Sequence, residues 1–356
     1  MQEKGFVCPE CKSELLMQDG LYTCRNCASE WRVKDGIPCF LKGDVPYWCE
    51  LSAEEAVDLN RIAETKGWRK AAESCFTEKL QQFVMDENRI NWKYFINSDT
   101  EGRILDAGSG WGTIAFALSE QCCSVYAFES VWERARFIRI RKEQDKVINL
   151  YPVCGNILKL PFPDNYFDVV ILNGVLEWLG MSDRTYSPDK VQEAALRNIF
   201  RVLKPGGTLY IGIENALAYF YFFGKRDPHS GLRFATLMPR WMANIYSKLV
   251  KKREYSTYIY SLRGYRKILN NSGFKDINFY VPVPGYLKFK YLVPLEPFYI
   301  FRYWIDSILY EKLLFSPVLL RKFVFFVRLL LRCPFLRFSR NFVPDFGIIA
   351  CKGNSI

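Results

Sequence analysis

The sequence contains no stretch of 18 residues without a charged side chain, so no segment is typical of a membrane-spanning helix. It also contains no internal repeat and no low-complexity tract. Its first residues lead directly into cysteines rather than into the apolar run of a signal peptide. These absences predict a folded cytoplasmic protein whose 12 cysteines stay reduced, some of them on a metal.

Four of the cysteines form two Cys-x-x-Cys pairs separated by twelve residues: Cys8, Cys11, Cys24 and Cys27. Two such pairs suit a tetrahedral four-thiolate zinc site, in which each tight turn supplies two ligands. A redox role is disfavoured because it needs a single pair beside a βαβ unit. Four unrelated buried cysteines are the remaining alternative. The spacing favours a closed, structural zinc site in a small ribbon.

Glycines alternate directly after a short apolar run at 103–106. Gly108, Gly110 and Gly112 precede a segment with helical character, 113–119. A strand, a tight turn and a helix start in this order allow the backbone to approach a ligand closely. On their own, the three glycines fit a dinucleotide site, another nucleotide site or only a tight turn.

The next apolar run ends in Glu129, a carboxylate placed to accept hydrogen bonds from ribose hydroxyls. At this point the chain resembles the class I S-adenosylmethionine-dependent methyltransferases. The resemblance covers roughly residues 100–215 and rests on Asp106 to Gly112, Glu129, Gly155-Asn156-Ile157, Phe167 to Val170, Leu176-Glu177 and Leu203 to Gly207. It implies that S-adenosylmethionine is the cofactor, and it implies a cofactor-binding set of Asp106, Gly108, Gly110, Gly112, Glu129, Asn156, Ile157 and Asn173. Asn156 departs from the usual aspartate but can accept the same hydrogen bond from adenine.

Strand–helix alternation over 101–215 predicts an α/β fold with a largely parallel sheet, covered on both faces. The resemblance makes this a Rossmann-like seven-stranded methyltransferase sheet. The expected domains are a zinc ribbon at 1–45, a helical linker and cofactor cover at 46–100, a methyltransferase domain at 101–285 and 341–356, and a basic apolar helical insertion at 286–340. The ribbon resembles the small zinc proteins that activate methyltransferases. Five polar side chains fall at carboxyl ends of strands, where ligands of such sheets bind: Asp106, Glu129, Asn156, Asn173 and Glu214.

The net charge of +11 is concentrated after the core. Residues 225–267 hold 11 Lys/Arg and 2 acids, and residues 286–340 hold ten and three. This balance indicates an anionic or amphiphilic acceptor, or ordinary solvated lysines. Segment 317–334 predicts an apolar helix with Arg321, Arg328 and Arg332 on one face. Such a helix suits peripheral contact with the inner membrane face, or burial against the domain or in a dimer.

The chain has a single histidine, His229, in a polar turn where this fold presents its substrate. Its side chain suits a general base for an alcohol acceptor, and an exposed loop residue is the alternative. Trp178, beside Glu177, either stacks on a ligand or fills the helix–sheet interface. The leading hypothesis is O-methylation of a small molecule, glycan or lipid-linked glycan. The alternatives are RNA methylation, with rRNA or tRNA as the partner, and a non-catalytic cofactor-binding adaptor.

Overall fold

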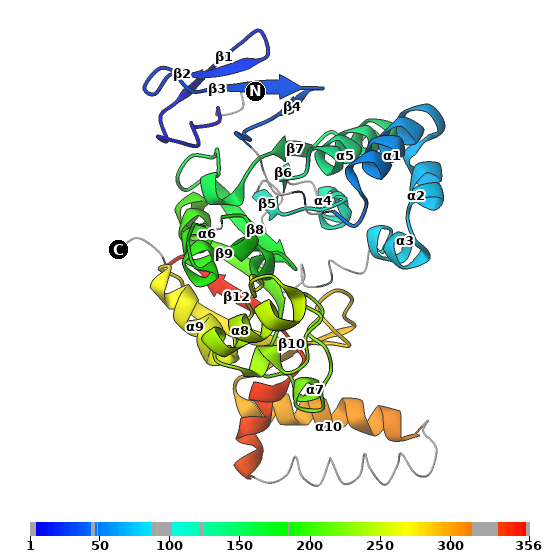
Figure 1. The fold of residues 1–356 in the computed structure, drawn as a ribbon, viewed down its shortest axis with the longest axis vertical. Coiled ribbons are helices and arrows are strands. Elements are labelled where there is room, and N and C mark those ends of the chain that lie inside the picture. Colours follow the sequence, from blue (N-terminus) through cyan, green and yellow to red (C-terminus); the bar gives the residue numbers. More distant parts are fainter. Residues whose placement is uncertain are drawn as a thin grey trace.

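In a computed structural model, the chain forms a small antiparallel sheet and a large mixed sheet (Figure 1). The structure describes residues 5–43, 47, 49–86, 91, 102–120, 124–183, 185–314 and 334–353. Successive residues of the central strand β8 (Phe167–Asn173) alternate between two cores. Val170 and Leu172 face one core, while Val169 and Ile171 face the other. Both faces of the large sheet are therefore buried, as expected for a predominantly parallel sheet.

The other strands are β1 (Leu15–Gln18), β2 (Leu21–Cys24), β3 (Glu30–Lys34), β4 (Ile37–Pro38), β5 (Arg103–Ala107), β6 (Ser124–Glu129), β7 (Leu150–Cys154), β9 (Leu203–Glu214), β10 (Lys275–Val283), β11 (Tyr291–Pro294) and β12 (Asp345–Cys351). The α-helices are α1 (Ala53–Lys66), α2 (Trp68–Cys75), α3 (Glu78–Val84), α4 (Thr113–Ser119), α5 (Trp132–Gln144), α6 (Pro188–Val202), α7 (Tyr219–Phe222), α8 (Arg240–Lys251), α9 (Leu262–Asn271) and α10 (Phe298–Leu314). The 3₁₀ helices are η2 (Ile157–Lys159), η3 (Leu176–Met181), η4 (Ala235–Leu237) and η5 (Pro334–Phe342).

The large sheet has the order β11-β10-β12-β9-β8-β5-β6-β7. Strands β5 to β9 pair in parallel, and β12 lies antiparallel between β9 and β10. The α/β prediction is confirmed, but the predicted count of seven strands is wrong by one. The additional strand, β11, comes from the insertion that was expected to be helical. It pairs antiparallel with β10, because the chain turns back after Val283 and can extend the open edge of the sheet.

The N-terminal sheet, order β1-β2-β3-β4, packs against the large sheet at its β7 edge (Figure 1). The backbone N–H of Phe40 donates to the carbonyl of Cys154, at 2.7 Å, and that of Val7 to the carbonyl of Pro161, at 3.0 Å. The rings of Phe6 and Phe162 lie 5.6 Å apart. The ribbon thus shares a hydrophobic core with the larger domain instead of standing apart from it.

Three helices, α1 to α3, occupy the predicted linker and pack on α4 and α5. The rings of Trp111 and Phe137 pack against the ring of Phe76, the residue that follows α2. Within the predicted insertion the structure describes β11, α10 and η5. The arginine-bearing segment at 317–333, including Arg321, Arg328 and Arg332, lies outside the described residues. None of the described helices has both the length and the apolar composition needed to cross a bilayer.

Candidate active site

The glycine turn follows β5 and places backbone, rather than side chains, at the cofactor cavity. Gly108 has φ +81°, and a Cβ there would lie 2.6 Å from Val175, so only glycine fits. Gly110 has φ +56° with open space around it. The backbone N–H groups of Gly108 and Ser109 both donate to the carbonyl of Phe128, at 2.8 and 3.2 Å. These bonds fasten the turn to β6 and fix its approach to the cavity.

Glu129, at the end of β6, holds this turn in place. Its carboxylate accepts the backbone N–H groups of Gly110, at 2.8 Å, Ser130, at 2.8 Å, and Val131, at 3.0 Å. The guanidinium of Arg134 lies 3.8 Å from the same carboxylate and also pairs with Glu50. Trp111 donates its indole N–H to Glu50 at 3.1 Å. Although burial opposes it, Arg134 holds the pKa of the Glu50 carboxyl below its usual value.

A cavity of about 360 Å³ opens at the carboxyl ends of β5, β6 and β8. Five predicted cofactor residues line it: Asp106, Gly108, Gly110, Glu129 and Asn173. Within the described part of the chain, both amide atoms of Asn173 and the hydroxyl of Ser109 are buried without a hydrogen-bond partner. Buried polar atoms of this kind are costly unless a ligand satisfies them. The donor and acceptor set therefore fits a nucleoside with hydroxyl and amine groups.

Three predicted residues lie outside the cavity lining. Gly112 supports packing, since a Cβ there would meet Ile138 and Phe116 at 3.0 and 3.1 Å. Asn156 begins η2, and its side-chain oxygen accepts the backbone N–H of Leu158 at 2.9 Å. Ile157 is 7% exposed and belongs to the core. The second lone pair of this oxygen stays available for an adenine amino group.

Sequence reasoning missed several lining residues. Glu50 comes from the linker and Arg134 from α5, while Phe83 and Val84 come from α3. The hydroxyl of Thr113 donates to the carbonyl of Val84 at 2.8 Å, which fixes α3 over the glycine turn. Ser109 could have been found, because it lies inside the predicted turn. No local pattern marks Glu50, since its partner is 84 positions away.

A second group of side chains lies beyond Trp178, which lines the cavity and meets the ring of His229 edge-on at 4.8 Å. The His229 side chain is 5% exposed, so the alternative of a solvent-exposed loop residue is wrong. Its Nδ1 is 3.1 Å from the Asp227 carboxylate, and its Nε2 is 3.6 Å from Glu214 and 3.8 Å from Glu177. We call Glu177, Glu214, Asp227 and His229 the acidic–histidine cluster.

The surroundings of Glu177 and His229 favour the protonated forms of both side chains at neutral pH. Burial, reinforced by the charge of Glu214, raises the pKa of Glu177 from 4.5 to about 8. Burial opposes the imidazolium, but the hydrogen bond to Asp227 and the nearby carboxylates outweigh it and raise the pKa of His229 to about 9. The ligand atoms of Glu177, Glu214 and His229 are close enough to share a metal ion. Because the pKa of His229 is raised, a metal ion bound there would have to displace a proton from the imidazole.

These pKa shifts predict that the folded state loses stability on the alkaline side. A raised pKa contributes stability that is complete below the unfolded value and is lost as pH rises through the folded value. For His229 this window runs from 6.5 to about 9, and for Glu177 from 4.5 to about 8. We expect the free energy of unfolding to fall by roughly 3 kcal/mol over the His229 window alone, since one pKa unit corresponds to about 1.4 kcal/mol. Urea titrations across the range measure it. Glu177→Gln should flatten the slope, and an unchanged slope would assign the titration to other groups.

The four thiolates predicted to bind zinc are brought together in the ribbon. Cys8 and Cys27 have their sulfurs 3.5 Å apart, and Cys11 and Cys24 theirs 3.4 Å apart. All four sulfurs lie within 4.8 Å of one another. Tetrahedral zinc with bonds of about 2.3 Å requires sulfurs in this range. The cluster therefore fits a structural zinc ion, and its four ligands leave no open position.

Comparisons with known proteins agree with this geometry. Residues 105–211 match the family model described as a methyltransferase domain. An uncharacterized methyltransferase of Schizosaccharomyces pombe is 36% identical over 155 residues, which cover 41% of this chain and 46% of that protein. A ubiquinone/menaquinone biosynthesis C-methyltransferase of Neisseria gonorrhoeae is 47% identical over 91 residues, covering 24% and 33%. The chain thus spans less than half the length of these curated relatives.

Among solved structures, phosphoethanolamine N-methyltransferase 2 of Haemonchus contortus, in complex with S-adenosylhomocysteine, aligns with a TM-score of 0.45 and 18% identity. The alignment covers 89% of this chain and 62% of that one. The family match covers the glycine turn, Glu129 and Asn173, which line the cavity. The chain therefore contains a class I S-adenosylmethionine-dependent methyltransferase domain with a Rossmann-like α/β fold.

Proposed function

We propose that this protein transfers a methyl group from S-adenosylmethionine to an oxygen of a small-molecule, glycan or lipid-linked glycan acceptor. The observation that carries the proposal is the placement of two sites on either side of Trp178. The nucleoside-sized cavity with Glu129 lies on one side, and the acidic–histidine cluster on the other. Bound in the cavity, the sulfonium cofactor supplies an electrophilic methyl group.

The residues of the chain contribute positioning and proton transfer. Glu129 accepts the ribose hydroxyls, while Ser109 and Asn173 satisfy polar groups of the nucleoside or methionine part. Aligning an acceptor oxygen with the methyl group supplies a large share of the rate enhancement for an in-line displacement. An alcohol must also lose its proton, and Nε2 of deprotonated His229 accepts it, because Asp227 holds the proton on Nδ1. Glu177 and Glu214 stabilise the resulting imidazolium.

The basic character of the region beyond β9 supports an anionic or amphiphilic acceptor. Lys225, Arg226 and Arg233 are exposed on the loop that carries His229. A screen of RNA, total lipid and saccharide fractions with labelled cofactor distinguishes this acceptor class from RNA. Label in RNA alone would replace the proposal with RNA methylation, and no label in any fraction would favour a cofactor-binding adaptor.

Glu129→Ala should weaken binding of S-adenosylhomocysteine by about 1–3 kcal/mol, or roughly 5- to 150-fold. The change removes the ribose acceptor and leaves three backbone N–H donors of the turn without their carboxylate. Isothermal titration calorimetry measures the affinity, and circular dichroism checks the fold. Glu143→Ala is the matched control, since its carboxylate is 59% exposed and pairs only with Arg139 on the same helix. Equal affinity in both variants, or no binding by the unmodified protein, would remove the cofactor assignment.

The ribbon holds a zinc ion in this proposal and supports the cofactor side of the domain. Lys159, the last residue of η2, pairs with Glu10 at 2.7 Å, and Lys12 reaches the carbonyl of Leu160 at 3.4 Å. These contacts fix the segment that follows β7, which borders the cofactor strands. A structural zinc next to this segment gives it rigidity that the short η2 turn lacks.

A further inference from the structure

Helix α8 presents apolar side chains to solvent. Trp241, Ile245 and Leu249 recur every four residues and are 66%, 53% and 77% exposed. The opposite side of the helix carries the buried residues Ala243, which packs with Leu232 and Ala235, and Ser247, whose hydroxyl donates to the carbonyl of Arg253 at 2.9 Å. The usual orientation of a surface helix, with its apolar stripe turned inward, is therefore reversed.

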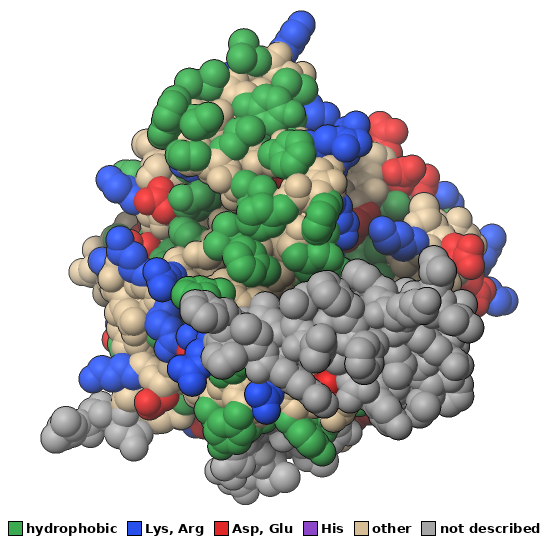
Figure 2. Space-filling view, turned by 90° about the horizontal axis from the view of Figure 1, so that it is seen from below, with side chains coloured by type: hydrophobic (Ala, Val, Ile, Leu, Met, Phe, Trp, Pro, Cys, Tyr) green, Lys and Arg blue, Asp and Glu red, His purple; other side chains and the backbone are tan. Residues whose placement is uncertain are grey.

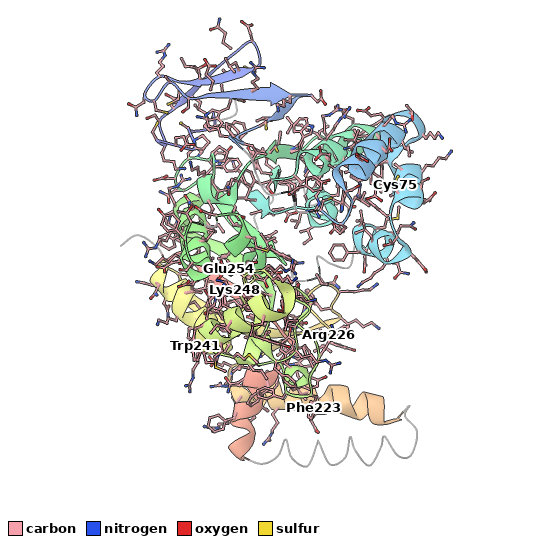
Figure 3. All side chains as sticks on the ribbon, in the orientation of Figure 1. Cys75, Phe223, Arg226, Trp241, Lys248 and Glu254 are labelled. Carbon is pink, nitrogen blue, oxygen red and sulfur yellow. The ribbon has the colours of Figure 1, made fainter. Side chains whose placement is uncertain are left out.

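The end of helix α7, which contacts η4 as α8 does, also exposes apolar side chains. Phe222 and Phe223 are 50% and 86% exposed, and the ring of Phe222 contacts Phe342 of η5 at 5.7 Å. Viewed from below, hydrophobic side chains gather over a broad area of the molecule, with lysines and arginines at its margins (Figure 2). We call the side chains Phe222 of α7, Phe223 directly after it, and Trp241, Ile245 and Leu249 of α8 the apolar face. Of these, Phe223 and Trp241 lie in the lower part of the molecule (Figure 3).

Within residues 219–253, the segment that carries the apolar face, the exposed charges are of one sign. Between residues 219 and 253 the only acid is Asp227, and its side chain is 2% exposed inside the acidic–histidine cluster. The exposed charged residues of this segment are Lys225, Arg226, Arg233, Lys248, Lys251, Lys252 and Arg253. Lys248 pairs with Glu254 at 2.9 Å, just outside the segment (Figure 3). A partner of this surface must therefore present both negative charge and an apolar region that can bury the exposed side chains.

We propose that the apolar face docks the protein on the surface of an anionic lipid bilayer. Tryptophan, phenylalanine and leucine beside lysines suit the headgroup–acyl boundary, where apolar side chains insert and cations meet anionic headgroups. A second copy of the chain would bring the same cations against each other across a symmetric interface. RNA would satisfy the lysines and could stack on Trp241, but it would leave Ile245 and Leu249 without an apolar partner.

Docking would also position the active site. Asp227 and His229 lie on the loop between Phe223 and Phe234, both of which are exposed. Seating this loop at headgroup depth would place the acidic–histidine cluster next to a membrane-borne acceptor. This last consequence rests on the proposed methyl transfer, whereas the docking itself does not.

Sedimentation with vesicles of phosphatidylglycerol and phosphatidylcholine tests the proposal on the full chain. We expect binding at low salt that weakens in high salt. Trp241→Ser/Ile245→Ser/Leu249→Ser should lower the partition coefficient at least roughly tenfold. In the variant Lys248→Glu/Lys251→Glu/Lys252→Glu, vesicle binding should no longer depend on the phosphatidylglycerol content. Ile148→Ser is the matched control, because Ile148 is 86% exposed and belongs to the segment between α5 and β7.

Several outcomes would overturn the docking proposal. The protein could stay in the supernatant at low salt, or the triple serine variant could bind as well as the parent. Analytical ultracentrifugation could show a dimer that the triple serine variant dissociates, which would assign the apolar face to a second copy. Single-stranded RNA could displace the parent from the vesicles, and the triple serine variant could fail to bind this RNA. That result would assign the apolar face to nucleic acid.

Calorimetry with S-adenosylhomocysteine separates this result from the proposed function. The triple serine variant should bind it like the parent, which also shows that the variant is folded. If that variant fails to fold, Phe223→Ser alone tests the surface, because its ring is 86% exposed. An unmodified protein that binds vesicles but not S-adenosylhomocysteine would contradict the methyltransferase proposal and leave the docking intact.

Discussion

A His229→Ala variant should turn over roughly 10²–10⁴-fold more slowly than the parent, with unchanged affinity for S-adenosylhomocysteine. In the proposed reaction the imidazole removes the acceptor proton, and Asp227 fixes the ring so that Nε2 faces Glu177 and Glu214. His229 does not line the cofactor cavity, so its loss leaves that site intact. Steady-state kinetics with the acceptor identified by the screen, together with calorimetry, measure the two effects separately.

The pH profile distinguishes proton transfer from a structural contribution. Because the pKa of His229 is about 9, the kcat/KM of the parent should rise with pH up to that value. The alanine variant should lose this rise, and added imidazole should restore part of the turnover. Tyr186→Ala, at a side chain 61% exposed between η3 and α6, is the control. A loss of turnover below about tenfold, which corresponds to little over 1 kcal/mol of activation barrier, would contradict the role of His229 as the general base.

Cys24→Ser should unfold the N-terminal ribbon. The ribbon has little core of its own: three of the four residues of β1 are exposed, and Trp31 and Phe40 are buried partly against the larger domain. Small domains of this kind depend on their metal, with binding free energies of about 10–16 kcal/mol in zinc-finger peptides. Losing one of four thiolates removes most of that energy.

Metal analysis should find one zinc per chain in the parent and little in the variant. Limited proteolysis should cut the variant, or the chelated parent, within the first 40 residues. Cys75→Ser is the matched control, because Cys75 ends α2, well away from the ribbon (Figure 3). A metal-free protein whose ribbon resists protease would contradict the zinc assignment. Since the ribbon contacts the segment after β7, the variant should also bind S-adenosylhomocysteine more weakly.

The cofactor half of the molecule could be predicted because its signals are local. The strand predicted at 124–129 is β6 as found, and Glu129 ends it where the carboxylate reaches the cavity. Gly108 and Gly110 have the positive φ values that a turn between strand and helix requires. Asn156 was less predictable, because its side chain satisfies the backbone of its own turn at Leu158.

The acceptor half could not be predicted in the same way. Glu214 could be placed at a strand end, and His229 in a turn, but nothing local brings either to Glu177. Their contact depends on how the loop after α7 folds back over η3. The same holds for Glu50, which reaches Arg134 across 84 positions of chain.

The sequence by itself predicted the strands β5 and β6, the glycine turn, the carboxylate that ends β6 and the group of four cysteines, because residue periodicity and short spacings specify local conformation. Only the tertiary structure decided that β11 joins the sheet, that His229 is buried among carboxylates and that α8 turns its apolar side outward. These features depend on which surfaces remain unpaired once the sheet and its helices have packed. No window of sequence contains that information, since each contact joins segments that become neighbours only in the fold.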